Sequence, residues 1–135
     1  MLDLIIKNGQ CYIDGELKDV DVAVKDGKIH KIGEISEETK EILNAEGQTV
    51  LPGCIDTQTH FREPGSTDTE DLHSGSRAAI AGGITGVFEM PNTNPPTSTK
   101  LEFQKKLDLA KNRMYCNYAF YFGATASNAN ELAEL

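Results

Sequence analysis

Short runs of Val and Ile alternate with turn signals over residues 1–50. The expected strands are Leu2–Lys7, Val20–Val24 and Lys28–Ile32. The turn signals are Asn8-Gly9, Asp14-Gly15 and Asp26-Gly27. Asp-Gly between two apolar runs is a strong hairpin signal. The pattern therefore predicts a small antiparallel β-sheet over residues 1–50, as part of a β-sandwich domain, with a solvated loop or short helical turn from Glu34 to Glu41.

From Thr49 the pattern of apolar and polar residues changes, because short apolar runs now alternate with longer segments of helical character. The expected strands are Cys54–Thr59, Ile84–Glu89 and Tyr115–Phe122, and the expected helices are Glu70–Ala81 and Thr99–Asn112. Strands that alternate with helices of this length are typical of a parallel α/β unit. Residues 51–135 therefore predict an α/β fold.

The ends of the helices carry recognisable signals. Gly82-Gly83 predicts the stop of the first helix, and Ser98 or Thr97 can cap the second. Asn128 predicts the cap of a third helix that is cut off at Leu135. Three strand-helix units, the last unfinished, correspond to part of a TIM-type (β/α)8 barrel, which needs eight units and typically about 250 residues. Residues 51–135 are thus expected to be the first three strands of an incomplete barrel.

Composition narrows the functional classes. The formal net charge is −8, from 21 acidic and 13 basic residues, without a cluster of Lys and Arg, which argues against nucleic acid and against an anionic membrane surface as partners. Cys11, Cys54 and Cys116 are odd in number and widely spaced, which fits reduced thiols in a cytoplasmic protein. No apolar run approaches the roughly 20 residues that span a bilayer. We therefore expect a soluble cytoplasmic protein.

Polar residues alternate along the first expected barrel strand and beyond it. Asp56, Gln58, His60 and Arg62 would share one face of an extended strand. In an α/β barrel, side chains at the carboxyl end of a strand build the site. The alternation makes this face the candidate functional surface.

The residues around this face resemble the signature of dihydroorotases. Leu51-Pro52-Gly53-Cys54-Ile55-Asp56-Thr57-Gln58-Thr59-His60-Phe61-Arg62-Glu63-Pro64-Gly65 is similar to the family pattern P-G-x-I-D-x-H-x-H-F-R-E-P-G. Two further blocks follow in the family's order, Gly75-Ser76-Arg77-Ala78-Ala79 with Ala81-Gly82-Gly83-Ile84-Thr85, and Met90-Pro91-Asn92-Thr93-Asn94-Pro95-Pro96. Hydantoinases, dihydropyrimidinases and allantoinases share the fold but typically lack the F-R-E-P-G sequence or its Arg, so dihydroorotase is the nearest subfamily.

The resemblance implies a zinc-dependent cyclic amidohydrolase. In that family the H-x-H pair binds zinc, and a metal-activated water opens the ring amide of dihydroorotate reversibly, in pyrimidine biosynthesis. His60 matches the second histidine and is the expected metal ligand. Arg62 and Asn92 match the residues that hold the substrate, and a guanidinium suits a substrate carboxylate because it offers a planar pair of donors.

The departure is Gln58, where the family has its first histidine. A carboxamide is a much poorer zinc ligand than imidazole. The family's carboxylated lysine, further histidines and catalytic aspartate lie on later strands, so this chain has no catalytic residue of its own. We expect zinc binding to be weak or absent, and the isolated chain to be inactive.

Three hypotheses stay open. The chain is a piece of a dihydroorotase-like enzyme, or a non-catalytic homologue that serves as a scaffold for aspartate transcarbamoylase, or a small α/β interaction module that self-associates as a homo-oligomer through exposed strand edges. Gln58 favours the second.

The remaining polar candidates have simpler interpretations. We interpret His30 and His73 as solvated or capping residues, and Asp56 as structural support. Gly82-Gly83 lacks the surrounding pattern of a phosphate loop. Pro91, Pro95 and Pro96 stiffen the loop that carries Asn92.

Overall fold

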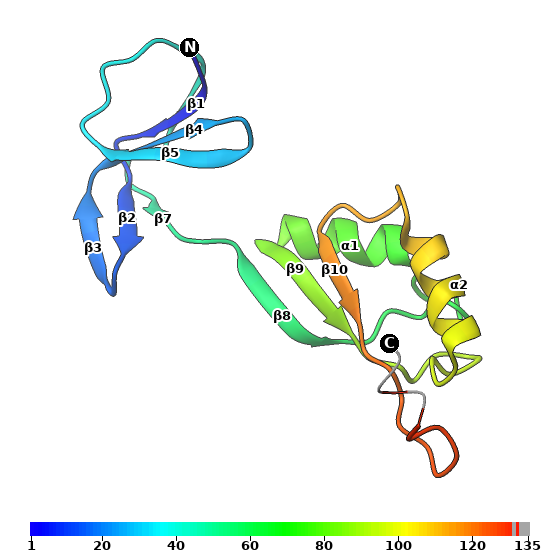
Figure 1. The fold of residues 1–135 in the computed structure, drawn as a ribbon. Helices are drawn as coiled ribbons and strands as arrows, with labels where there is room; N and C mark the ends of the chain where they lie inside the picture. Colours follow the sequence, from blue (N-terminus) through cyan, green and yellow to red (C-terminus); the bar gives the residue numbers. More distant parts are fainter. Residues whose placement is uncertain (131, 133–135) are drawn as a thin grey trace. The chain divides into compact units, whose positions relative to one another are not determined.

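The computed structural model describes residues 1–130 and 132, and the chain divides into two compact units, residues 1–52 and 53–135 (Figure 1). The first unit, all of whose residues are described, contains strands and no helix. The second contains three strands and two helices within its described residues. Each unit has its own cluster of buried apolar side chains.

Seven strands form two sheets in the first unit. They are β1 (Leu2–Lys7), β2 (Gln10–Ile13), β3 (Glu16–Asp19), β4 (Asp21–Lys25), β5 (Lys28–Gly33), β6 (Thr39–Asn44) and β7 (Thr49–Val50). The first sheet has the order β5-β4-β1-β6, and the second has the order β3-β2-β7. Leu2, Ile5, Ala23 and Ile35 form the core of this unit.

The predicted turn at Asp26-Gly27 joins β4 to β5. Both residues have positive φ, 52° for Asp26 and 71° for Gly27, as the tight turns of two-residue hairpins require. Asp14 and Gly15 repeat this geometry between β2 and β3, with φ values of 53° and 87°. Local turn chemistry therefore fixes these two hairpins.

The expectation of a purely antiparallel sheet is wrong in two places. Strand β6 pairs in parallel with β1, and β7 pairs in parallel with β2. The predicted loop Glu34–Glu41 is also too long, because β6 begins at Thr39. β6 is an exposed edge strand, so its pairing depends on backbone hydrogen bonds to β1 and leaves little apolar alternation in the sequence.

The second unit is a parallel α/β unit, as predicted. Its elements are β8 (Cys54–Thr59), α1 (Leu72–Ala81), β9 (Ile84–Glu89), α2 (Lys100–Ala110) and β10 (Asn117–Phe120). The sheet order is β10-β9-β8, with both pairings parallel. Leu72 of α1, Ala110 of α2 and Val87 of β9 share one buried cluster, so both helices pack against this sheet (Figure 1). The barrel itself stays a prediction.

The helix ends differ in detail from the predicted signals. Asp71 caps α1 and forms a capping box with Ser74. Thr99, and not Ser98 or Thr97, caps α2, because its hydroxyl accepts the backbone N–H of Glu102 at 3.2 Å. Gly82 ends α1 as predicted. No helix among residues 1–130 is long and apolar enough to cross a membrane.

Asn128 holds the loop before it. Its side-chain oxygen accepts a hydrogen bond from Thr125 N at 2.8 Å, and its amide donates to Ser98 O and Gly123 O, both at 2.8 Å. The third helix predicted after Asn128 involves residues 131 and 133–135, which lie outside the described residues.

Candidate functional site

His60 and Asn92 meet at the carboxyl ends of two neighbouring parallel strands. His60 directly follows β8, and Asn92 lies three residues after β9. The Nδ1 atom of His60 lies 2.9 Å from Oδ1 of Asn92. A carbonyl oxygen only accepts hydrogen bonds, so a hydrogen bond at this contact uses the ring form that carries its proton on Nδ1. Both side chains are exposed, which leaves Nε2 available to a ligand.

The loops that carry these residues are joined by backbone hydrogen bonds. Met90 N donates to Thr59 O at 2.9 Å, and Asn94 N donates to Pro64 O at 3.0 Å. Gly65, with φ of 125°, lies so close to Asn94 that a Cβ on the glycine would lie 3.0 Å from Asn94 Cβ. The peptide bonds before Pro64 and Pro95 are cis. The two loops therefore form one connected surface.

The predicted polar face is only partly a strand face. Strand β8 ends at Thr59, and its pairing with β9 shifts register between Asp56 and Thr59. His60 and Arg62 consequently lie in the loop after the strand, which corrects the expectation of four residues on one strand face.

Phe61 is buried, and a Cβ on Gly75 of α1 would lie 2.6 Å from its ring.

Arg62, Gln58 and Asp56 are exposed. Arg62 O accepts a hydrogen bond from Ser66 N at 2.8 Å, which closes a turn in the loop after β8. The Asp56 carboxylate accepts the backbone N–H of Gln58 at 2.9 Å. This contact agrees with the interpretation of Asp56 as structural support.

The donor set does not fit a complete zinc site. No three His, Cys, Asp or Glu side chains among residues 1–130 and 132 are grouped so that they could hold a metal ion. Structural and catalytic zinc sites use at least three protein ligands. His60 offers one imidazole, and the neighbouring candidate position holds the Gln58 carboxamide, so these residues alone fall short of the zinc ligands that the resemblance implies.

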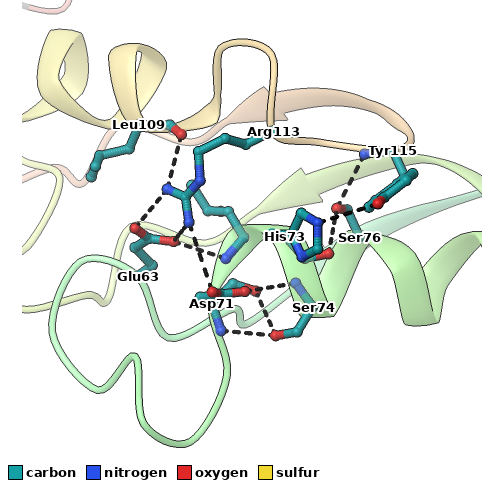
Figure 2. A network of polar contacts seen from close by, with 9 residues as sticks. Glu63, Asp71, His73, Ser74, Ser76, Leu109, Arg113 and Tyr115 are labelled. Carbon is teal, nitrogen blue, oxygen red and sulfur yellow. Dashed lines mark hydrogen bonds and ion pairs between the residues drawn. The ribbon is translucent and has the colours of Figure 1, made fainter.

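Glu63 was not singled out by the sequence pattern, although it lies inside the motif. Its carboxylate is buried and contacts the Arg113 guanidinium through both oxygens, at 2.8 and 3.1 Å (Figure 2). It also accepts the first N–H of α1, from Leu72 at 2.9 Å. Glu63 therefore ties the loop after β8 to α1 and to the segment after α2. The pairing raises the pKa of Arg113, because the hydrogen bond to Glu63 favours the charged guanidinium.

The start of α1 gathers further polar contacts. Asp71 lies 3.8 Å from Arg113, and hydrogen bonds from Ser74 lower the pKa of the Asp71 carboxyl (Figure 2). His73 lies with Nε2 3.2 Å from the Tyr115 hydroxyl, and the two rings meet edge to face. His73 thus contacts the start of the β10 segment and is not part of the candidate site.

Glu89 and Lys106 form a buried ion pair beneath the Asn92 loop, and both side chains are fully inaccessible to solvent. Burial raises the pKa of Glu89 to about 7, although the hydrogen bond from Lys106 acts in the opposite direction. Burial also lowers the pKa of Lys106. A sequence signal for this pair exists: Lys106 falls on the apolar stripe of α2, between Phe103 and Ala110 at helical spacing.

The open face of the sheet carries a hollow of about 290 Å³ that is distinct from the candidate site. Its lining comes from β8, β9 and β10 and includes Ile55, Phe88 and Tyr118. Ile55 is 62% exposed and Phe88 is 38% exposed. Neither His60 nor Asn92 lines the hollow.

Comparisons with known proteins agree with this architecture. Residues 49–134 match the model of the amidohydrolase family. The chain is 42% identical over 134 residues to an allantoinase of Escherichia coli O1:K1 / APEC and 43% identical to one of Salmonella choleraesuis. Both alignments cover 98% of this chain but only 30% of the relative. The chain thus spans about a third of the length of these relatives.

Solved structures give the same result. An L-hydantoinase (dihydropyrimidinase) from Arthrobacter aurescens superposes with a TM-score of 0.90 at 31% identity, covering 99% of this chain and 30% of its own. A D-hydantoinase (dihydropyrimidinase) from Thermus sp. superposes with a TM-score of 0.76 at 27% identity, covering 97% of this chain and 30% of its own.

Proposed function

Since the chain belongs to the amidohydrolase family, we propose that it carries the substrate-holding part of a site for cyclic-amide hydrolysis and does not complete that site by itself. The observation that supports this proposal is the His60–Asn92 contact at the ends of β8 and β9, with the exposed Arg62 two residues after His60 in the same loop. Zinc in this family supplies an activated water. The described residues do not fit zinc, so we assign no hydrolytic step to them.

The substrate class is a cyclic amide. The relatives reported above are named allantoinase and hydantoinase, so the comparisons support this class and not dihydroorotase in particular. The argument for dihydroorotate rests on Arg62, because its guanidinium suits a ring that bears a carboxylate. The side-chain oxygen of Asn92 contacts His60, so its amide N–H groups remain to donate hydrogen bonds to the carboxylate of dihydroorotate.

Ligand binding tests the substrate. We expect dihydroorotate to shift the NMR signals of residues 60–66 and 90–94, and 5,6-dihydrouracil, the same ring without the carboxylate, to shift them less. Arg62→Met should remove that difference. Arg77→Met is the matched control, because Arg77 is exposed on α1 and outside the site. Equal responses to both rings in the unchanged chain would argue for a substrate without a carboxylate, such as a hydantoin.

Hydrolysis tests the incompleteness of the site. We expect no opening of dihydroorotate, allantoin or hydantoin rings by the 135-residue chain, with or without added zinc. A rate clearly above buffer that disappears in a His60→Ala chain would contradict the proposal.

A non-catalytic role is the second candidate, and Gln58 is the observation that favours it. A homologue that has lost a ligand can serve as a scaffold, for which aspartate transcarbamoylase is the proposed partner. Co-sedimentation of the two proteins tests this role, and independent sedimentation contradicts it. Strands β8 and β10 are the edges of their sheet, so self-association is a further proposal. A monomer at high concentration in sedimentation velocity would contradict it.

A further inference from the structure

Lys106 is a fully buried lysine whose ammonium makes two hydrogen bonds and one ion pair. Its ammonium pairs with the Glu89 carboxylate and lies 3.3 Å from both Met90 O and Thr97 Oγ1. An ammonium has three donors and no acceptor, and two of them serve Met90 O and Thr97 Oγ1 while its charge is paired with Glu89. The Phe120 ring covers it, with its centroid at 5.1 Å.

The three partners are the ends of one loop. Glu89 is the last residue of β9, Met90 begins the loop that carries Asn92, and Thr97 lies near its end. Thr97 is itself buried, and its N–H donates to Pro91 O at 2.9 Å, while its carbonyl accepts Gly123 N at 2.7 Å. The ammonium therefore joins both ends of the segment from Met90 to Thr97.

Burying a lysine is unfavourable because its charge loses its water, and an apolar side chain of similar volume often fills such a position without loss of stability. Stability alone thus gives no reason for a charge here. The loop above the pair holds the Asn92 side chain 2.9 Å from His60 Nδ1. We propose that Lys106 is a positioning residue, which fixes the Asn92 loop and so holds the Asn92 side chain against Nδ1 of His60.

This inference rests on the proposed function only in taking His60 and Asn92 as the site. The test is the tautomer of the neutral His60 ring, read from ¹⁵N NMR of the labelled chain. In the unchanged chain we expect the proton on Nδ1. In the double variant Glu89→Leu, Lys106→Met, which removes both charges and keeps the apolar volume, we expect the ring to change to mainly the Nε2–H form.

Two controls keep the test decisive. Asn92→Ala should produce the same change of tautomer, whereas Lys105→Met, which removes an exposed lysine of the same helix, should produce none. If the double variant does not fold, Thr97→Val keeps the ion pair and removes one acceptor of Lys106, and we expect a change in the same direction. A folded double variant or a folded Thr97→Val chain with an unchanged tautomer would overturn the inference.

Zinc and substrate take no part in this measurement, which separates the two proposals. An unchanged tautomer together with dihydroorotate binding at Arg62 overturns the role of Lys106 and leaves the proposed function intact. If the double variant changes the tautomer but the unchanged chain binds no cyclic amide, the role of Lys106 stands and the proposed function is overturned.

Discussion

The carboxylate of Glu63 and the guanidinium of Arg113, fifty positions apart in the sequence, face each other through two hydrogen bonds of 2.8 and 3.1 Å. Glu63 is the residue directly after Arg62, and its second role is to accept the first N–H of α1 from Leu72. The pair therefore connects the loop of the candidate site to both helices that cover the sheet.

Loss of Arg113 should destabilise the chain. Removing one partner of a buried pair costs about 3–5 kcal/mol, and the Arg113 side chain is 35% exposed, so solvent screening reduces the effect. We expect Arg113→Met to lower the free energy of unfolding by about 2 kcal/mol. Urea denaturation measures the change, with Arg77→Met as an exposed control expected to stay within about 0.5 kcal/mol. Equal midpoints for both variants would show that the pair contributes nothing.

Glu89 should make stability depend on pH. Its pKa is raised to about 7 in the folded chain, from an ordinary 4.5, because burial disfavours the carboxylate. The folded state then binds more protons than the unfolded state between these values, so the contribution of Glu89 is full below about pH 4.5 and is lost as pH rises to about 7. Lys106 opposes this shift and the charge of Glu63 adds to it.

The measurement compares two chains. We expect the free energy of unfolding of the unchanged chain, relative to Glu89→Leu, Lys106→Met, to fall by about 3 kcal/mol between pH 4.5 and pH 7. Urea titrations at several pH values give this difference. The other carboxyl groups are present in both chains, so their contributions to the pH dependence cancel in the comparison. A difference that rises with pH over this range would contradict the raised pKa of Glu89.

Gly75 should tolerate no side chain. A Cβ at this position would lie 2.6 Å from two ring atoms of Phe61, which is buried in the core of the second unit. We expect Gly75→Ala to lower the free energy of unfolding by about 2 kcal/mol, as overpacked cores do. Gly82→Ala is the matched control, because the nearest atom to its Cβ would be Ala79 O at 3.5 Å. Thermal unfolding of both variants distinguishes a packing clash from a general effect of replacing glycine.

The fold was predictable from sequence where local signals decide it. Strands β8 and β9 occupy the predicted residues because apolar runs and flanking turns mark them, and the Asp26-Gly27 hairpin follows from turn chemistry alone. Strand β6 was not predictable in this way. Its residues are largely polar and exposed, and it forms because β1, far earlier in the chain, offers backbone partners.

The candidate site shows the same division. Parallel strands end at one edge of a sheet, so the approach of His60 and Asn92 follows from the predicted topology. The hydrogen bond between them depends on loop conformation, which periodicity does not encode. Lys106 is visible in the sequence as a charged residue on the apolar stripe of α2. Its partners could not be predicted, because they depend on how α2 packs on β9.

Gln58 offers a test of how much metal binding the chain can regain. Gln58→His would place two imidazoles at alternate positions of one segment, with His60 as the second, and imidazole is a far better zinc ligand than a carboxamide. We expect zinc affinity, measured by calorimetry, to rise at least about tenfold, since loss of a supporting partner alone typically costs 10- to 100-fold. Adding His60→Ala to this variant should abolish the gain. Ring hydrolysis should stay at the buffer rate in both variants, because two imidazoles still fall short of the three ligands of a catalytic zinc site. A zinc affinity unchanged by Gln58→His would show that positions 58 and 60 do not converge on one ion.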